Sequence, residues 1–150
     1  MIKDILLVCS VVIGLSGCNL FGDGNDTFQT SRELWLSQGL DHYRYEITIG
    51  CFCTIAGDTP ARVTVLDDSV SAAIRLRDNV DISSQQLAFI PSIEKLFDII
   101  REATGGEADE IEVTYDRQRG FPTSVSIDYI KDAVDDEISY SISAVQAIQE

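Results

Sequence analysis

The sequence has few of the residues on which metal sites, acid–base catalysis and nucleic-acid binding depend. Its 150 residues include one His, one Trp and one Met. A single His excludes a metal site with several His ligands and leaves little basis for a Ser–His–Asp triad. Lys and Arg number 11 against 25 Asp and Glu, which gives a formal charge of −14. Because phosphate binding depends on clustered cations, this charge argues against a nucleic-acid partner.

The chain also lacks an apolar run long enough to span a membrane comfortably. The uncharged run near its N-terminus is shorter than such a span. Residues 5–17 carry no charge. A membrane span needs about 20 apolar residues, whereas a shorter run is typical of a signal-peptide core. The run ends in Leu15-Ser16-Gly17-Cys18, which resembles the cleavage box of bacterial lipoproteins. The resemblance implies a signal peptide over residues 1–17 and lipidation at Cys18. An ordinary secretory signal that carries a Cys and an apolar N-terminal helix of the fold are the alternatives.

A lipid at Cys18 would place the protein in the cell envelope, because more than one acyl chain gives stable attachment to a membrane. Asn19 stands where lipoproteins retained in an inner membrane commonly have Asp. The resemblance therefore implies outer-membrane attachment, facing the periplasm or the cell surface, if the cell is Gram-negative. Residues 18–30 are rich in Gly, Asn and Asp, which predicts a flexible tether between the lipid and a single domain over residues 31–150.

Periodic apolar residues predict the secondary structure of that domain. Capping signals followed by helical spacing predict helices over 31–38 and 92–103. Alternating apolar residues predict strands over 42–53, 62–66, 70–77, 110–116, 123–130 and 137–144, whereas residues 78–86 are polar and irregular. Short connections favour antiparallel pairing. We therefore expect an α+β fold, a two-layer sandwich in which two helices cover one face of an antiparallel sheet of about six strands. The order α-β-β-β-α-β-β-β makes 31–77 and 92–144 two similar halves.

Several short motifs resemble one known family. They are Trp35 with Tyr43-x-Tyr45, Cys51-x-Cys53, the helix segment Ser92–Phe97, and Tyr115-Asp116 with Gly120-Phe121-Pro122-Thr123 and Asp128-Tyr129. Together they are similar to a family of uncharacterised bacterial lipoproteins, the domain of unknown function 6174, over about residues 31–142. The resemblance implies an envelope location and a small α+β domain. It implies no activity.

The pair Cys51-Phe52-Cys53 is the sharpest chemical feature of the sequence. A local structural disulfide, redox activity, free thiols and a metal such as Cu(I) are the alternatives. A disulfide that closes so short a loop contributes only about 1.6 kcal/mol to stability in the chain-entropy model. A fully extended strand separates the Cα atoms of residues two apart by about 6.5–7 Å, the upper limit for a disulfide. We expect a local disulfide with a kink near Phe52 and a structural role.

Two further segments hold candidate site residues. Asp116 can bond turn amides beside Gly120, and an exposed Phe121 after that turn is a candidate interaction residue. Acidic residues between Asp128 and Glu137 could suggest Ca²⁺, but they lack the order of carboxylates found in a calcium loop. We therefore predict a solvated acidic turn, without a metal or another cofactor.

These features predict a lipid-anchored envelope protein that works as a non-enzymatic binding or protein-interaction module. The anchor, the tether and the missing catalytic set favour this function, with an unknown envelope protein or a small ligand as the partner. The alternative is a redox-active envelope protein that uses Cys51 and Cys53, for which Arg44 is the one candidate cation. A small-ligand site on the open face of the sheet is a third hypothesis.

Overall fold

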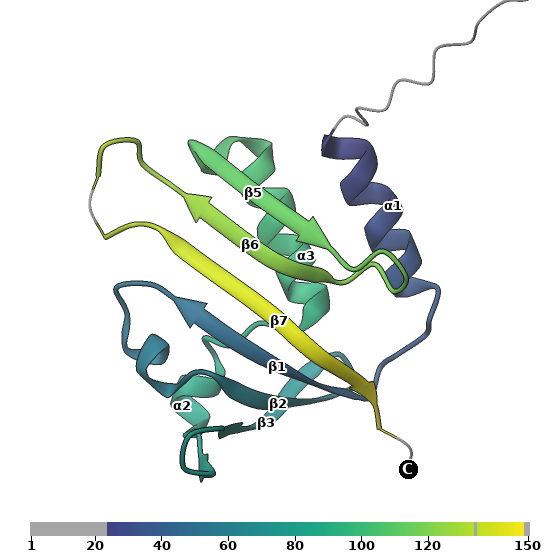
Figure 1. Ribbon diagram of the computed structural model, residues 1–150, viewed down its shortest axis with the longest axis vertical. Coiled ribbons are helices and arrows are strands. Elements are labelled where there is room, and N and C mark those ends of the chain that lie inside the picture. Colours follow the sequence, from purple (N-terminus) through teal and green to yellow (C-terminus); the bar gives the residue numbers. More distant parts are fainter. Residues whose placement is uncertain (1–23, 134, 149–150) are drawn as a thin grey trace, which may run out of the picture.

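The strands follow from alternating apolar residues, because every second side chain of a strand faces the same side. The computed structural model describes residues 24–133 and 135–148. Its strands are β1 (Tyr43–Gly50), β2 (Ala61–Leu66), β3 (Ser69–Arg75), β4 (Val80–Asp81), β5 (Glu110–Tyr115), β6 (Pro122–Asp128) and β7 (Ile138–Ala147). Within these residues they form one sheet of seven strands in the order β4-β3-β2-β1-β7-β6-β5, and every neighbouring pair is antiparallel (Figure 1).

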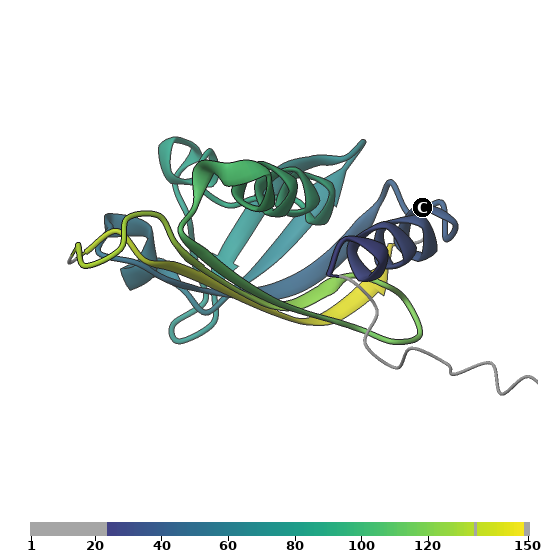
Figure 2. The ribbon, with the colours of Figure 1, turned by 90° about the horizontal axis from the view of Figure 1, so that it is seen from above.

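Two main helices cover one face of this sheet. They are α1 (Gly24–Leu36) and α3 (Ile93–Glu102), and Figure 2 shows both on the same side of the curved sheet. The short helix α2 (Ser84–Leu87), the 3-10 turn η1 (Thr54–Asp58) and the π turn η2 (Ala103–Glu107) belong to the connections. The described helices and turns leave the opposite face of the sheet open. None of the described helices is long and apolar enough to cross a membrane.

The core lies between the two main helices and the sheet. The buried residues of α3 recur at helical spacing, and alternate residues of β1 meet them from below: Ile93, Leu96, Phe97 and Ile100 from α3, with Tyr43, Tyr45, Ile47 and Ile49 from β1. Two aromatic contacts attach α1 to this core. The ring centroids of Trp35 and Tyr43 are 5.3 Å apart, and those of Phe28 and Phe97 are 5.9 Å apart. Aromatic residues at the two ends of α1 therefore hold that helix on β1 and α3.

The predicted fold class is confirmed, since the protein is an α+β fold with two main helices and an antiparallel sheet. The predicted cap of the second helix is also present, because the Ser92 hydroxyl oxygen accepts from the Lys95 N–H at 3.2 Å. The strands of each predicted half form a continuous part of the sheet, and β1 pairs with β7 where the two parts meet. An origin of the halves by duplication stays a prediction.

Local structure departs from the predictions in three places. The first helix begins at Gly24 instead of Ser31 and includes residues predicted as tether, because Phe28 is buried against Phe97, a contact that composition does not reveal. Strand β1 ends at Gly50, before the cysteine pair. Residues 78–86, predicted to be irregular, contain β4, which pairs with β3 and makes the seventh strand. The predicted signal peptide and Cys18 lie outside the described residues.

Candidate functional site

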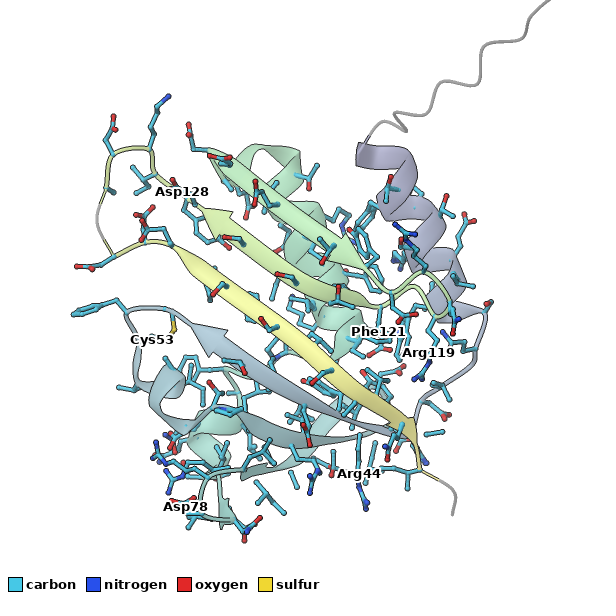
Figure 3. The ribbon with its side chains drawn as sticks, viewed as in Figure 1. Arg44, Cys53, Asp78, Arg119, Phe121 and Asp128 are labelled. Atoms are coloured by element: carbon cyan, nitrogen blue, oxygen red, sulfur yellow. A yellow bond between two sulfur atoms is a disulfide. The ribbon has the colours of Figure 1, made fainter. Side chains whose placement is uncertain are left out.

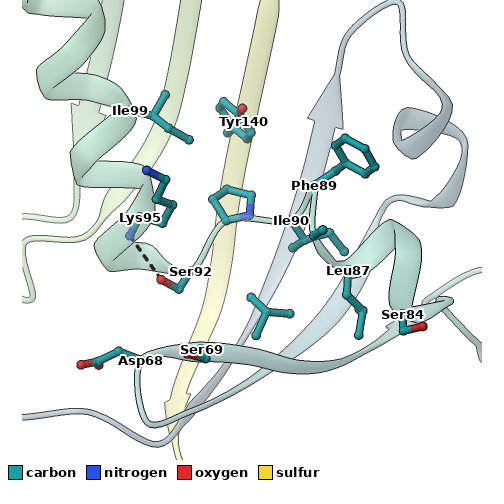
Figure 4. Close-up of a pocket in the computed structure, with 13 residues that line it drawn as sticks. Asp68, Ser69, Ser84, Leu87, Phe89, Ile90, Ser92, Lys95, Ile99 and Tyr140 are labelled. Atoms are coloured by element: carbon teal, nitrogen blue, oxygen red, sulfur yellow. Dashed lines mark hydrogen bonds between the residues drawn. The ribbon is translucent and has the colours of Figure 1, made fainter.

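A groove lies between α3, α2 and the β2–β3 hairpin on the helix-covered side of the sheet (Figure 4). Its volume is about 590 Å³, within the range of about 300–1,000 Å³ that is typical of ligand sites. Most of its lining is apolar: Val70, Leu87, Ala88, Phe89, Ile90, Pro91, Ile99 and Tyr140, with Asp68, Ser69, Ser84, Ser92 and Lys95 as the polar residues. We call this the α3 groove.

The segment that links α2 to α3 forms the centre of the α3 groove. Ile90 and Pro91 are buried, whereas Phe89 is 66% exposed. The Tyr45 hydroxyl donates to the carbonyl oxygen of Pro91, and the Tyr43 hydroxyl accepts from the first N–H of α3 at 2.9 Å. Two tyrosines of β1 therefore hold the segment from below, and Phe89 projects outward from it.

A hydrogen-bond network fixes the first turn of α3 beside the groove. The Glu94 carboxylate accepts from Trp35 Nε1 at 2.7 Å and, through its other oxygen, from the Tyr43 hydroxyl at 2.6 Å. Burial and then the charge of Glu94 raise the pKa of Tyr43 above its usual range, and burial likewise raises the pKa of Tyr45. Both tyrosines therefore stay protonated and can donate. Because the network joins α1, β1 and α3, it positions one wall of the groove.

The α3 groove carries one ammonium group and one carboxylate. Lys95 extends from the first turn of α3, and Asp68 lies in the β2–β3 turn. No described residue forms an ion pair with Lys95. The Tyr140 side chain contributes a further wall, and burial raises its pKa to about 12. An ammonium group that pairs with no described residue and lies beside apolar walls suits a surface that presents an apolar side chain together with a carboxylate.

Cys51 and Cys53 lie at disulfide distance just beyond the end of β1. Their Cα atoms are 5.2 Å apart, within the usual range of about 4.4–6.8 Å. The chain bends over residues 51–53, which agrees with the expected kink. Cys51 is half-buried, Cys53 is exposed, and the Phe52 side chain between them is 83% exposed. Cys51 therefore packs against the border of the core, whereas Phe52 and Cys53 stand at the surface.

The surroundings of the cysteine pair are acidic. Asp135 and Glu137 line a cavity together with Cys51 and Phe52, and nearby carboxylates disfavour the thiolate form of a cysteine. Arg44, the candidate cation for redox chemistry, belongs to the opposite end of β1 (Figure 3). The fold therefore does not bring the predicted cation to the thiols.

Asp116 and Phe121 belong to the β5–β6 turn. The Asp116 carboxylate accepts from the N–H groups of Gln118 at 2.9 Å and Arg119 at 2.7 Å, which confirms its predicted bonds to turn amides. The predicted exposure of Phe121 is wrong, because this side chain is only 6% exposed. Its ring packs edge-on against Trp35 at 6.1 Å, with the Arg119 guanidinium 5.6 Å above it.

Gly120 explains how Phe121 becomes buried. It has a φ of +82°, and a Cβ atom at this position would collide with backbone atoms of α1. A residue without a side chain is therefore needed for the turn to approach the helix. That approach carries Phe121 under α1 (Figure 3), and it depends on a contact between segments far apart in sequence.

The acidic β6–β7 connection forms a hydrogen-bonded turn. The Ile130 N–H donates to Asp128 Oδ1 at 3.2 Å and to Asp136 Oδ2 at 2.6 Å. In the part of the chain that the structure describes, no group of three or more His, Cys, Asp or Glu side chains is placed to hold a metal ion. His42, directly before β1, lies with its Nε2 atom 3.1 Å from Asp67 Oδ1. The Asp128 and Asp136 carboxylates therefore accept from a local backbone N–H, and the Asp67 carboxylate lies beside His42.

Sequence reasoning missed the residues of the α3 groove. Phe89 lies between the predicted polar stretch, 78–86, and the predicted second helix, 92–103, and Lys95 lies in the first turn of that helix. The available signal was the apolar run Leu87–Pro91 between these two segments, which is longer than a connection between two elements requires. The pattern of this run does not show that Phe89 is its exposed residue, because that depends on which residues of the run pack on β1.

Fold and groove together define a small α+β sandwich domain with a lateral apolar groove. Residues 27–147 match the model of the family of unknown function DUF6174, and the chain belongs to that family. No curated protein and no solved structure matches the chain. Membership confirms the family that the motifs predicted, and a lipoprotein nature and a bacterial source stay proposals.

Proposed function

We propose that this protein is a lipid-anchored member of the bacterial cell envelope that acts as a non-enzymatic binding module for another envelope protein. The box Leu15–Cys18 supports the anchor, because it combines small residues with a cysteine directly after an uncharged run. Asn19 favours the outer membrane if the cell is Gram-negative. The α3 groove supports the binding role.

The observation that carries the binding role is the exposure of Phe89 beside the α3 groove. This aromatic side chain is 66% exposed at the rim of a cavity of about 590 Å³. Exposed apolar surface next to a groove is typical of interaction sites. A small ligand inside the groove would leave the outward side of Phe89 in water, whereas a protein surface covers the ring and the groove together. A protein partner is therefore favoured over a small ligand.

Cross-linking of the anchored chain in intact cells tests the binding role. The test variant is Phe89→Ser, and Phe52→Ser is the matched control, because Phe52 is 83% exposed at a different place. We expect the same cross-linked partner from the wild type and the control, and about tenfold less from Phe89→Ser, since a buried aromatic anchor contributes at least about 1.4 kcal/mol to an interface. Equal recovery from all three would contradict the proposal.

The Cys18→Ser variant tests the anchor. A serine cannot carry the thioether-linked lipid, so we expect loss of acyl labelling and either release from the membrane fraction or accumulation of the unprocessed precursor. The double variant Cys51→Ser/Cys53→Ser is the control, and it should stay attached. Acyl labelling that persists after Cys18→Ser would show that the cleavage box was misinterpreted.

Thiol–disulfide exchange at Cys51 and Cys53 is a second candidate function, and the exposure of Cys53 is the observation that favours it. A thiolate of a partner would attack one sulfur, and the other sulfur would leave as a thiolate. The acidic neighbours Asp135 and Glu137 oppose this step. A reduction potential of about −120 to −200 mV would support exchange, and a potential below about −300 mV would exclude it in favour of a structural disulfide.

A further inference from the structure

Strand β5 ends the sheet on one side, and its outer border carries no further strand among the described residues. β5 pairs only with β6 there, over its whole length from Glu110 to Tyr115. Figure 2 looks onto this border, with α1 and α3 above it. A strand at the edge of a sheet presents unpaired N–H and C=O groups that can pair with another extended chain.

The helix-facing row of β5 is apolar and incompletely covered. Ile111, Val113 and Tyr115 pack against the core and are only partly buried. The Tyr115 ring stacks on Phe97 with centroids 6.1 Å apart. Phe97 in turn contacts Phe28, which lines a cavity of about 370 Å³ between α1 and the end of α3. This cavity is lined by α1 and by the end of α3, and the apolar row of β5 itself is only partly covered.

The opposite row of β5 carries two glutamates that are not paired with a cation of the described residues. Glu110 and Glu112 are exposed on the open face of the sheet. Their partners across β6 are Asp128 and Ser126, so the neighbouring strand supplies no cation. Neither glutamate forms an ion pair with a described residue. Cations on an added strand would lie directly beside these carboxylates, where opposite charges stabilise strand pairing.

We propose that the β5 edge binds an extended segment of a partner protein, in which Lys or Arg alternates with apolar residues. Side chains of a strand alternate between the two faces of the sheet. The apolar residues of the segment meet Ile111 and Val113 under the helices, and its cations meet Glu110 and Glu112. A second copy of this chain does not fit, because two β5 strands would bring glutamates of like charge together.

The other edge of the sheet lacks these features. β4 has only two residues, both exposed, and it pairs with Ile74 and Arg75; the rest of β3, with which it does not pair, contains no Asp or Glu. Arg75 on the neighbouring β3 is already paired with Asp58 at 2.6 Å and with Asp78 at 2.8 Å. The β5 edge is also distinct from the α3 groove, so this inference goes beyond the proposed function and does not depend on it.

Binding of labelled peptides to the full chain in detergent micelles tests the proposal. The first probe alternates Lys with Val and is about as long as β5; the second replaces Lys by Glu; the third is the Lys probe with N-methyl groups along one backbone edge. We expect binding of the first probe only, weakening with salt. The N-methylated probe should fail because it cannot donate to the edge.

Charge reversal on β5 supplies the decisive variant. In Glu110→Lys/Glu112→Lys we expect about tenfold weaker binding of the Lys probe and new binding of the Glu probe, because the sign of the edge is inverted. The control Glu33→Lys/Asp81→Lys changes the net charge equally, at exposed residues of α1 and β4, and should change affinity less than about twofold. The new binding of the Glu probe shows that the β5 variant is folded.

Three results would each overturn the proposal. They are equal binding of the Lys and Glu probes, equal binding of the N-methylated probe, and equal loss of affinity in both charge-reversal variants. The Phe89→Ser variant separates this proposal from the α3 groove, because it should bind the Lys probe as the wild type does. If the peptides fail while partner cross-linking still depends on Phe89, only the β5 inference fails.

Discussion

The two parts of the sheet have the same connectivity, but the second part ends in an outer strand, β5, whose apolar row is less buried than the rows of the inner strands β1, β2 and β6. On β1 and β2, helix-facing residues such as Tyr45 and Val63 have no exposed surface. On β5 the corresponding residues Val113 and Tyr115 are only partly buried. The outer borders differ as well, since the two-residue strand β4 pairs with Ile74 and Arg75 of β3 on one side, and β5 is the last described strand on the other.

This difference separates stability from binding within one small domain. The first part of the sheet, with α1 and the first turn of α3, holds the aromatic residues and the Glu94 network that fix the fold. The second part has an apolar row and an acidic row that reach the edge. Changes in the first part should therefore act mainly on the free energy of unfolding, and changes at the edge mainly on binding.

The largest effect is expected from removal of Trp35, the largest fully buried side chain. Trp35→Ala should lower the free energy of unfolding by about 3–5 kcal/mol, because the loss of a buried aromatic leaves a cavity. Tyr115→Ala on the partly buried row should cost less than half as much. Urea unfolding of both variants checks this. Equal losses would show that the two parts of the sheet contribute alike.

A smaller loss is expected when Glu94 is replaced. Glu94→Ala removes the acceptor of both Trp35 Nε1 and the Tyr43 hydroxyl, and unsatisfied donors should lower the free energy of unfolding by about 1–3 kcal/mol. Glu94→Gln keeps one acceptor oxygen and should lose less. Asp98→Ala, on the same helix and partly exposed, is the matched control. If the control loses as much as Glu94→Ala, the network does not stabilise the first turn of α3.

The cysteine pair follows the last residue of β1, at the border of the core. Cys51→Ser/Cys53→Ser should cost about 1–2 kcal/mol, since the closed loop is short and Cys53 is already exposed. Thermal unfolding with and without reductant measures the loss, and reductant should affect only the wild type. A loss as large as that of Trp35→Ala would show that the pair supports the core.

Alkaline pH should also distinguish the two parts of the sheet. Burial raises the pKa of Tyr115 and Tyr140 to about 12 from the ordinary 10.0, and it raises the pKa of Tyr43 and Tyr45 further above that value. Between pH 10 and 12 the folded state therefore binds more protons than the unfolded state. Stability is full below pH 10 and falls as the pH rises toward 12.

Tyrosinate absorbance and stability measured over the same pH range check this prediction. Tyr115 and Tyr140 should ionise before the chain unfolds, and Tyr43 and Tyr45 only on unfolding. Tyr140→Phe should remove one early transition and reduce the alkaline loss of stability. A single transition for all buried tyrosines, unchanged by Tyr140→Phe, would contradict the difference between the two parts.

Local patterns were sufficient for much of the fold. The alternation from Tyr43 to Ile49 predicted β1, and the cap at Ser92 with Ile93, Leu96 and Ile100 predicted α3, because each signal involves residues near in sequence. The features that the sequence did not predict depend on contacts between residues far apart in the chain. Phe28 extended α1 by packing on Phe97, and Gly120 let the β5–β6 turn bury Phe121 beneath α1.

The sequence by itself determined the α+β class and the antiparallel hairpins, because periodicity, capping and short connections act over a few residues. Its motifs also resemble the family to which the chain belongs. Only the tertiary structure decided which apolar residues became surface. Phe89 projects because Tyr45 and Tyr43 of β1 hold the segment behind it, and Val113 stays half-covered because β5 ends the described sheet. Burial depends on all the neighbours of a residue in space, and the spacing of residues along the chain does not specify those neighbours.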